Sequence, residues 1–161
     1  MVNSGLMRSV SVDEVRAISE LARVASKDAV AVATEVLADD VANARWRDQI
    51  GPCLTQTAAA ALLGITPQAV AKRAGAFELL RLVNGDGRPA YPLFQFSGRR
   101  VVDGLGAVLR TLGQIDDDLT MAAWLTTPKR SLGGRTPVDA LEEGDAAGVL
   151  GAAEDYLARS A

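Results

Sequence analysis

Apolar side chains recur at helical spacing along much of the chain. After Val12, and again between about residues 27 and 45, an apolar residue stands at every third or fourth position. This spacing predicts two N-terminal helices. The same pattern predicts an amphipathic helix over residues 101–112 and a C-terminal helix over residues 145–159. The sequence therefore predicts a mainly α-helical protein.

Two short helices are predicted between residues 55 and 74. Thr55 is suited to cap a helix over residues 56–63, and Thr66-Pro67 to start a second one that ends near Ala74. The small residue, the glycine and the apolar residue expected in a helix-turn-helix stand at Ala60, Gly64 and Val70. This geometry presents the second helix to the major groove of DNA. An alanine-rich helix pair without a DNA function remains the alternative.

A β-hairpin is predicted behind the helix pair. The apolar run 79–83 leads into Asn84-Gly85-Asp86-Gly87, a strong tight-turn signal, and residues 88–96 return with β-favouring side chains. Pro89 and Pro92 predict that the returning strand is an edge strand or irregular, because proline cannot donate to a sheet. We interpret the hairpin as a wing. Its aromatic side chains are expected in the core: Tyr91, Phe94 and Phe96.

The charge is unevenly distributed over a chain whose formal net charge is −3. Residues 51–100 carry 6 basic and 2 acidic side chains, whereas residues 101–161 carry 5 basic and 10 acidic ones. The basic middle segment therefore suits an anionic partner, and the acidic C-terminal segment suits a basic protein. A solvated acidic face is the alternative for the latter. The candidate DNA-binding residues are Thr66, Gln68, Ala71, Lys72, Arg73 and Arg88. A glutamine can read adenine, and basic side chains hold phosphates or guanine.

Little in the composition suggests catalysis. The chain has no histidine and one cysteine, Cys53, which excludes an intramolecular disulfide and a zinc site. Asp116-Asp117-Asp118 is interpreted as a capping, solvated run rather than a metal site. We therefore expect no enzyme activity, no cofactor and no metal. Without an apolar run long enough to span a bilayer or a signal peptide, the protein is expected to be soluble and cytoplasmic.

Three segments are predicted along the chain. Residues 1–50 form a helical arm, for packing or for dimerisation; the boundary follows from the break at Gly51-Pro52. Residues 51–100 hold the helix-turn-helix with its wing, and residues 101–161 form a small helical domain. A homodimer is expected, because helix-turn-helix proteins usually read two half-sites.

The stretch from Trp124 to Gly144 contains most of the turn signals in the last segment. Thr136-Pro137 predicts a helix start, with acidic residues in the early turns where the helix dipole favours them. Gly133 and Gly134 allow backbone angles that other residues avoid. A docked loop followed by a rigid helix start indicates a binding surface rather than a reaction centre.

This stretch resembles the toxin-binding domain of the Xre/MbcA/ParS antitoxins. The resemblance rests on Trp124-Leu125, Pro128, Leu132, Gly134-Arg135-Thr136-Pro137, Leu141 and Gly144. Lys129 departs from the asparagine expected after the proline, and Gly133 looks inserted. The Ala90-to-Phe96 run is similar to the DNA-binding part of actinobacterial members.

The resemblance implies an antitoxin of a type II toxin–antitoxin system. Its C-terminal region would occlude a RES-domain toxin that consumes NAD⁺, and its middle segment would bind the operon's own promoter DNA. Higher hetero-oligomers with the toxin are implied, and no membrane partner. The toxin-binding candidates are Trp124, Arg135, Pro137, Glu154, Asp155, Tyr156 and Arg159.

Three alternatives stay open. For Trp124 the favoured alternative is that it simply anchors the domain core. Arg135 is equally suited to an internal pair with Glu142 or Glu143, which would fix the loop. A helix-turn-helix regulator without a toxin partner is the alternative for the whole chain.

Overall fold

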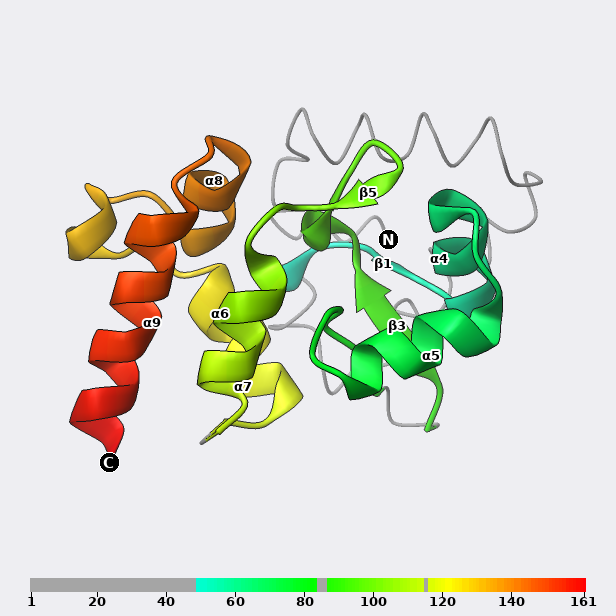
Figure 1. Cartoon of the computed structure of the whole chain (residues 1–161), viewed down its shortest axis with the longest axis horizontal. Helices are drawn as coiled ribbons and strands as arrows, with labels where there is room; N and C mark the ends of the chain where they lie inside the picture. The colour runs from blue at the N-terminus through cyan, green and yellow to red at the C-terminus, as the bar shows by residue number, and fades with distance from the viewer. Residues whose placement is uncertain (1–48, 84–86, 115) are drawn as a thin grey trace, which may run out of the picture.

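The computed structural model describes residues 49–83, 87–114 and 116–161, and this part of the chain is mainly helical, as predicted (Figure 1). The predicted N-terminal helices, within residues 1–48, and the hairpin turn Asn84–Asp86 lie outside the described residues. None of the described helices is both long and apolar enough to cross a membrane.

The first two described helices agree with the sequence prediction. Helix α4 spans Gln56–Leu63 and α5 spans Pro67–Gly75. Each begins at a threonine whose hydroxyl accepts a hydrogen bond from a backbone N–H, Thr55 from Ala58 and Thr66 from Ala69, both at 3.1 Å. Gly64 ends α4 with a φ of 68°, which few residues other than glycine adopt readily. A short turn therefore joins two well-capped helices.

The strand with two prolines lies at the centre of a small sheet, so the predicted edge position is wrong. Strand β3 (Pro89–Pro92) pairs antiparallel with β2 (Leu82–Val83) on one side and with β1 (Cys53–Leu54) on the other. The two neighbours contact different halves of β3: β2 lies opposite Pro89-Ala90, and β1 opposite Tyr91-Pro92. The prolines thus stand at the two ends of the strand, where a missing donor costs little.

A second hairpin follows, which the sequence prediction missed. After a 3₁₀ turn, η2 (Leu93–Gln95), strand β4 (Phe96–Ser97) pairs with β5 (Arg100–Val101). The helix predicted from Val101 therefore begins only at Leu105, so that α6 spans Leu105–Leu112. Gly104, with a φ of 87°, precedes it. The apolar periodicity begins before the helix because Val101 and Val102 also face the core.

The C-terminal segment consists of three further helices and a 3₁₀ turn. They are α7 (Asp118–Leu125), η3 (Arg130–Leu132), α8 (Pro137–Glu142) and α9 (Ala146–Ser160). Figure 1 shows α9 beside α6, with α8 above them and the C-terminus at the far end from α4 and α5. The predicted start of α8 and the predicted extent of α9 are confirmed within one residue.

The buried side chains form two clusters. One joins α6–α9 to residues of the middle segment, including Cys53, Leu80 and Phe94. The other lies beneath α4 and α5 and contains Tyr91 and Phe96. All three predicted core aromatics are thus buried. Because the first cluster holds side chains of both segments, hydrophobic burial supports the C-terminal helices on the sheet.

Candidate functional site

The loop between α7 and α8 is held in shape by its own backbone. The N–H of Lys129 donates to the carbonyl of Arg135 at 3.0 Å, and the N–H of Gly134 donates to the carbonyl of Lys129 at 2.9 Å. Leu132, only 2% exposed, anchors the loop in the core. Gly133 and Gly134 have φ angles of 67° and 85°, so the turn depends on glycine. The loop is a rigid feature of the surface.

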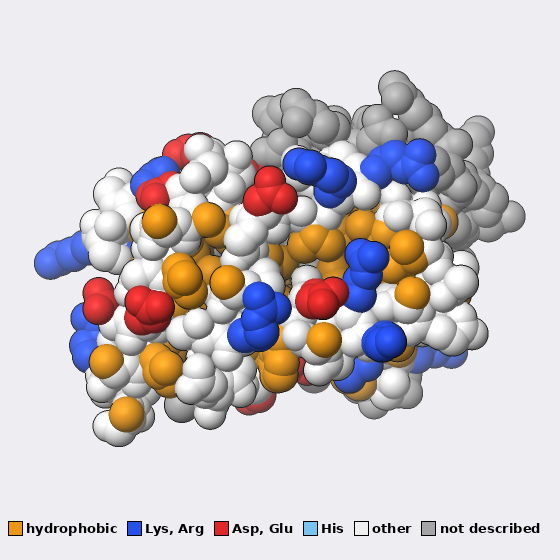
Figure 2. All heavy atoms as spheres, viewed as in Figure 1, with side chains coloured by type: hydrophobic (Ala, Val, Ile, Leu, Met, Phe, Trp, Pro, Cys, Tyr) orange, Lys and Arg blue, Asp and Glu red, His pale blue; other side chains and the backbone are white. Residues whose placement is uncertain are grey.

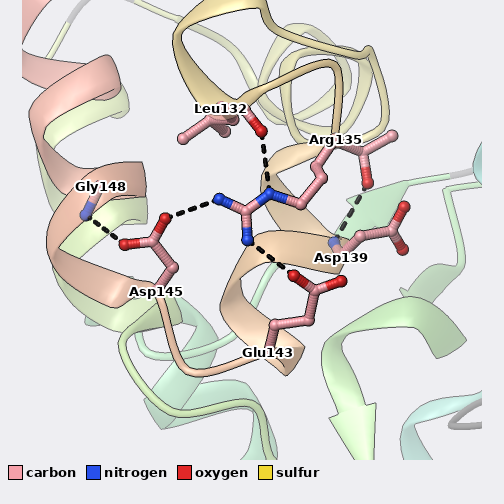
Figure 3. A network of polar contacts seen from close by, with 7 residues as sticks. Leu132, Arg135, Asp139, Glu143, Asp145 and Gly148 are labelled. Atoms are coloured by element: carbon pink, nitrogen blue, oxygen red, sulfur yellow. Dashed lines mark hydrogen bonds and ion pairs between the residues drawn. The ribbon is translucent and has the colours of Figure 1, made fainter.

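Arg135 joins this loop to both of the following helices (Figure 3). Its Nε donates to the carbonyl of Leu132 at 2.8 Å, and its two terminal nitrogens pair with Glu143 at 2.7 Å and Asp145 at 2.9 Å. Asp145 also caps α9, since its second oxygen accepts from the N–H of Gly148 at 3.0 Å. These hydrogen bonds to Glu143 and Asp145 raise the pKa of Arg135. One side chain therefore sets the position of η3, α8 and α9.

Trp124 lies behind the loop and is buried, with 6% of its surface exposed. Its ring centroid is 6.1 Å from that of Tyr156 on α9, and the ammonium of Lys129 lies 4.9 Å over it. The position of this ammonium fits a cation–π interaction. Tyr156 donates from its hydroxyl to Asp116 at 3.4 Å. The tryptophan thus anchors the loop and α9 to each other.

A hollow of about 340 Å³ lies between this loop and α9. Lys129, Arg130 and Ser131 line it from the loop, and Asp155 and Arg159 line it from α9. We call it the loop–α9 hollow. Arg130, Ser131, Asp155 and Arg159 are exposed and Lys129 is half-buried. The hollow is therefore lined mainly by charged side chains at the surface.

A second polar surface lies on α5 and the adjoining hairpins. Of the candidate DNA-binding residues, Ala71 is half-buried, whereas the others are exposed: Thr66, Gln68, Lys72, Arg73 and Arg88. Val70, fully buried, packs α5 against the core. On the face in Figure 2, basic side chains gather mainly over α4, α5 and the β4–β5 hairpin. This half of the molecule is the more electropositive one.

Comparison with known proteins identifies the C-terminal part. Residues 115–159 match the family described as the antitoxin Xre/MbcA/ParS C-terminal toxin-binding domain. They belong to this family. The toxin-binding domain thus contains α7, the loop, α8 and nearly all of α9, and it supports an antitoxin role in a toxin–antitoxin system, with a toxin as the partner.

The wider chain is similar to one solved structure. The NMR structure of Rv2175c matches 66% of this chain and 81% of its own, with 28% identity and a TM-score of 0.57. Among curated proteins, none matches the chain significantly. The structural likeness covers more of the chain than the toxin-binding domain does.

The predicted toxin contacts fall into two groups within the toxin-binding domain. Trp124 and Pro137 are buried, and Arg135 is engaged in the internal network described above. Glu154, Asp155 and Arg159 are exposed on α9, and Tyr156 is half-buried. The first group shapes the loop, and the second lies wholly or partly at the surface of α9.

Four basic residues were not among the candidates. Lys129 and Arg130 line the hollow, and Arg99 and Arg100 stand exposed at the β4–β5 hairpin. The Nε of Arg99 donates to the carbonyl of Leu62 at the end of α4, at 3.4 Å. The sequence held a signal in both places: in this chain a basic pair follows Pro128, and another follows the Ser97-Gly98 turn.

Proposed function

We propose that this protein is the antitoxin of a type II system and that it blocks a RES-domain, NAD⁺-consuming toxin with its C-terminal region. The observation that carries the proposal is the exposed face of α9, Glu154, Asp155 and Arg159, next to a rigid loop in a toxin-binding domain. Inhibition is steric and electrostatic, and it requires no chemistry from the antitoxin. The complex works in the cytoplasm, where both NAD⁺ and the operon lie.

The packing of α9 supports this role. Val149, Ala152 and Ala153 bury one face of the helix against the core, so the exposed side chains of α9 are presented on a preorganised support. Ordering costs about 0.5–1.5 kcal/mol for each side chain immobilised at an interface. A prearranged helix avoids most of the backbone part of that cost. Tyr156 adds a rigid aromatic edge, the kind of residue enriched in interface hot spots.

We further propose that the middle segment represses the operon by binding promoter DNA as a homodimer. The support is the exposed side of α5: Gln68 and Lys72 stand opposite buried Val70, and Arg73 is exposed next to Lys72. A helix-turn-helix places the start of its second helix against base edges. Gln68 is then a base-reading residue, and Lys72 and Arg73 contact phosphates or guanine.

Co-purification with the neighbouring RES-domain gene product tests toxin binding. The informative variant is Asp155→Arg with Arg159→Glu, which reverses exposed charges on α9 and leaves its buried face intact. Truncating α9 would instead remove core residues. Arg110→Gln, on the exposed side of α6, is the matched control. We expect the double variant to lose the complex while the control keeps it; equal recovery of all three proteins would contradict the proposal.

Promoter binding is measured separately as a function of salt. Lys72→Ala and Arg73→Ala should weaken binding to every sequence and each lower the salt slope by about 1, whereas Gln68→Ala should relax sequence preference. Arg110→Gln again serves as the control. Promoter binding by a protein that forms no complex with the toxin would favour the regulator without a toxin partner.

A further inference from the structure

The loop–α9 hollow is basic although the C-terminal segment that contains it is acidic. Residues 101–161 carry twice as many acidic as basic side chains. Yet three cations line the hollow, Lys129, Arg130 and Arg159, against the single carboxylate of Asp155. The net charge of the lining is +2, in a segment whose overall charge would attract basic partners.

These three cations are not neutralised within the described part of the chain. Lys129, Arg130 and Arg159 have no carboxylate within 4.0 Å there. Arg135, on the same loop, has two, Glu143 and Asp145. The loop thus uses one arginine to hold its shape, whereas Lys129 and Arg130 have no carboxylate counter-ion in the described part of the chain.

Lys129 is positioned by its surroundings rather than by a counter-ion. Its backbone N–H and carbonyl both take part in the loop's hydrogen bonds, and its ammonium lies over the ring of Trp124. Burial lowers the pKa of Lys129, since part of its hydration is lost. An incoming negative charge would restore the lost stabilisation of the ammonium.

We infer that the loop–α9 hollow is a socket for one acidic side chain of the toxin, which Lys129, Arg130 and Arg159 bind through its carboxylate. Arginine matches a carboxylate with two parallel hydrogen bonds, and Ser131 adds a hydroxyl donor. Asp155 limits the excess charge, which suits a singly charged aspartate or glutamate. The inference rests on the proposed function, because the partner is the toxin.

Zero-length cross-linking of the complex tests the socket. A carbodiimide joins a lysine amine to a carboxylate only where the two are in contact, and the chain has just three lysines, Lys27, Lys72 and Lys129. We expect a cross-linked peptide pair between Lys129 and one toxin aspartate or glutamate. A complex without any Lys129–toxin cross-link would overturn the inference.

Affinity measurements give an independent readout. Lys129→Met should weaken toxin binding roughly tenfold or more, since truncating one partner of a close interfacial charge pair is costly. Lys129→Arg should retain most of the affinity, and Lys72→Met, the control, should retain all of it. Arg130→Gln changes an exposed side chain and should weaken binding without affecting the fold.

Neutralising the cross-linked toxin acid completes the test. If Lys129 contacts that acid directly, combining Lys129→Met with the amide variant of the acid should weaken binding by less than the sum of the two single effects. If the wild-type protein forms the complex and Lys129→Met and Arg130→Gln bind the toxin with the same affinity, the socket is overturned while the proposed function stands. Absence of any wild-type complex would overturn the proposed function, and the socket with it.

Discussion

Arg135 and Asp145 form an ion pair of 2.9 Å that joins the α7–α8 loop to the first turn of α9. The same carboxylate caps the helix at Gly148, whose lack of a Cβ matters: a Cβ there would lie 2.6 Å from both Asp145 oxygens. Loop position and helix start are therefore coupled. The two elements that frame the loop–α9 hollow hold a fixed relationship through one arginine and one aspartate.

Replacing Arg135 should loosen the loop. In Arg135→Gln the links to Glu143, Asp145 and the Leu132 carbonyl are lost, and Arg135→Lys cannot reproduce them because lysine has no planar fork. Both variants should show faster amide hydrogen exchange at Lys129 and Gly134. Arg130→Gln, exposed on the same loop, is the control; wild-type exchange rates in Arg135→Gln would contradict the coupling.

Gln95 should matter for stability because its amide is buried and satisfied. It accepts from the N–H of Leu80 at 2.8 Å and donates to the carbonyls of Leu80 and Pro92 at 2.9 and 3.1 Å. Gln95→Leu leaves these backbone groups unpaired, so the free energy of unfolding should fall by about 2–4 kcal/mol. Urea denaturation measures it against Gln114→Leu on the surface. A loss no larger than that of the control would refute the network's importance.

Gly104 should tolerate no side chain. Its φ is 87°, and a Cβ would lie 2.7 Å from the Cβ of Ala146. Strain and overpacking together predict that Gly104→Ala lowers the free energy of unfolding by about 2–4 kcal/mol. Gly151→Ala, within α9 and without atoms near its Cβ position, should change it by about 0.5–1 kcal/mol in the stabilising direction. Thermal denaturation should therefore show a lower melting temperature for Gly104→Ala and a higher one for Gly151→Ala than for the wild-type protein.

Cys53 should be unreactive in the folded protein. Burial raises the pKa of its thiol from 9.0 to about 12. At pH 8 only about one thiol in 10⁴ is then ionised, so alkylation should proceed only as the protein unfolds in urea. Because the folded state keeps the proton, the thiol's contribution to stability should fall as the pH rises above about 9. In Cys53→Ala the free energy of unfolding should no longer show this decrease above about pH 9. Rapid alkylation of Cys53 in the folded protein would contradict its burial.

The helix starts were predictable because their signals are local. Thr55, Thr66 and Thr136 each accept a hydrogen bond from the backbone N–H three residues later. The cap side chain and the backbone of the next three residues suffice to specify that geometry. Arg135's internal pairing was predictable as an alternative for the same reason: Glu143 follows it closely in sequence.

The errors arose where contacts are distant in sequence. The central position of β3 depends on Cys53 and Leu54, more than 30 residues away, and no local pattern encodes such a pairing. Val101 has helical spacing but lies in a strand, because its partner Phe96 is set by the turn at Gly98. Lys129 was noticed only as a departure from a motif, since its relation to Arg159 exists only once α9 has folded back.

The most direct test of the antitoxin account is an NAD⁺-depletion assay with the proposed RES-domain toxin. Purified toxin is incubated with NAD⁺ alone, with an equimolar amount of the wild-type protein, and with the Asp155→Arg, Arg159→Glu variant. The account predicts that the wild-type protein stops depletion and that the variant does not. Undiminished depletion in the presence of the correctly folded wild-type protein would contradict it.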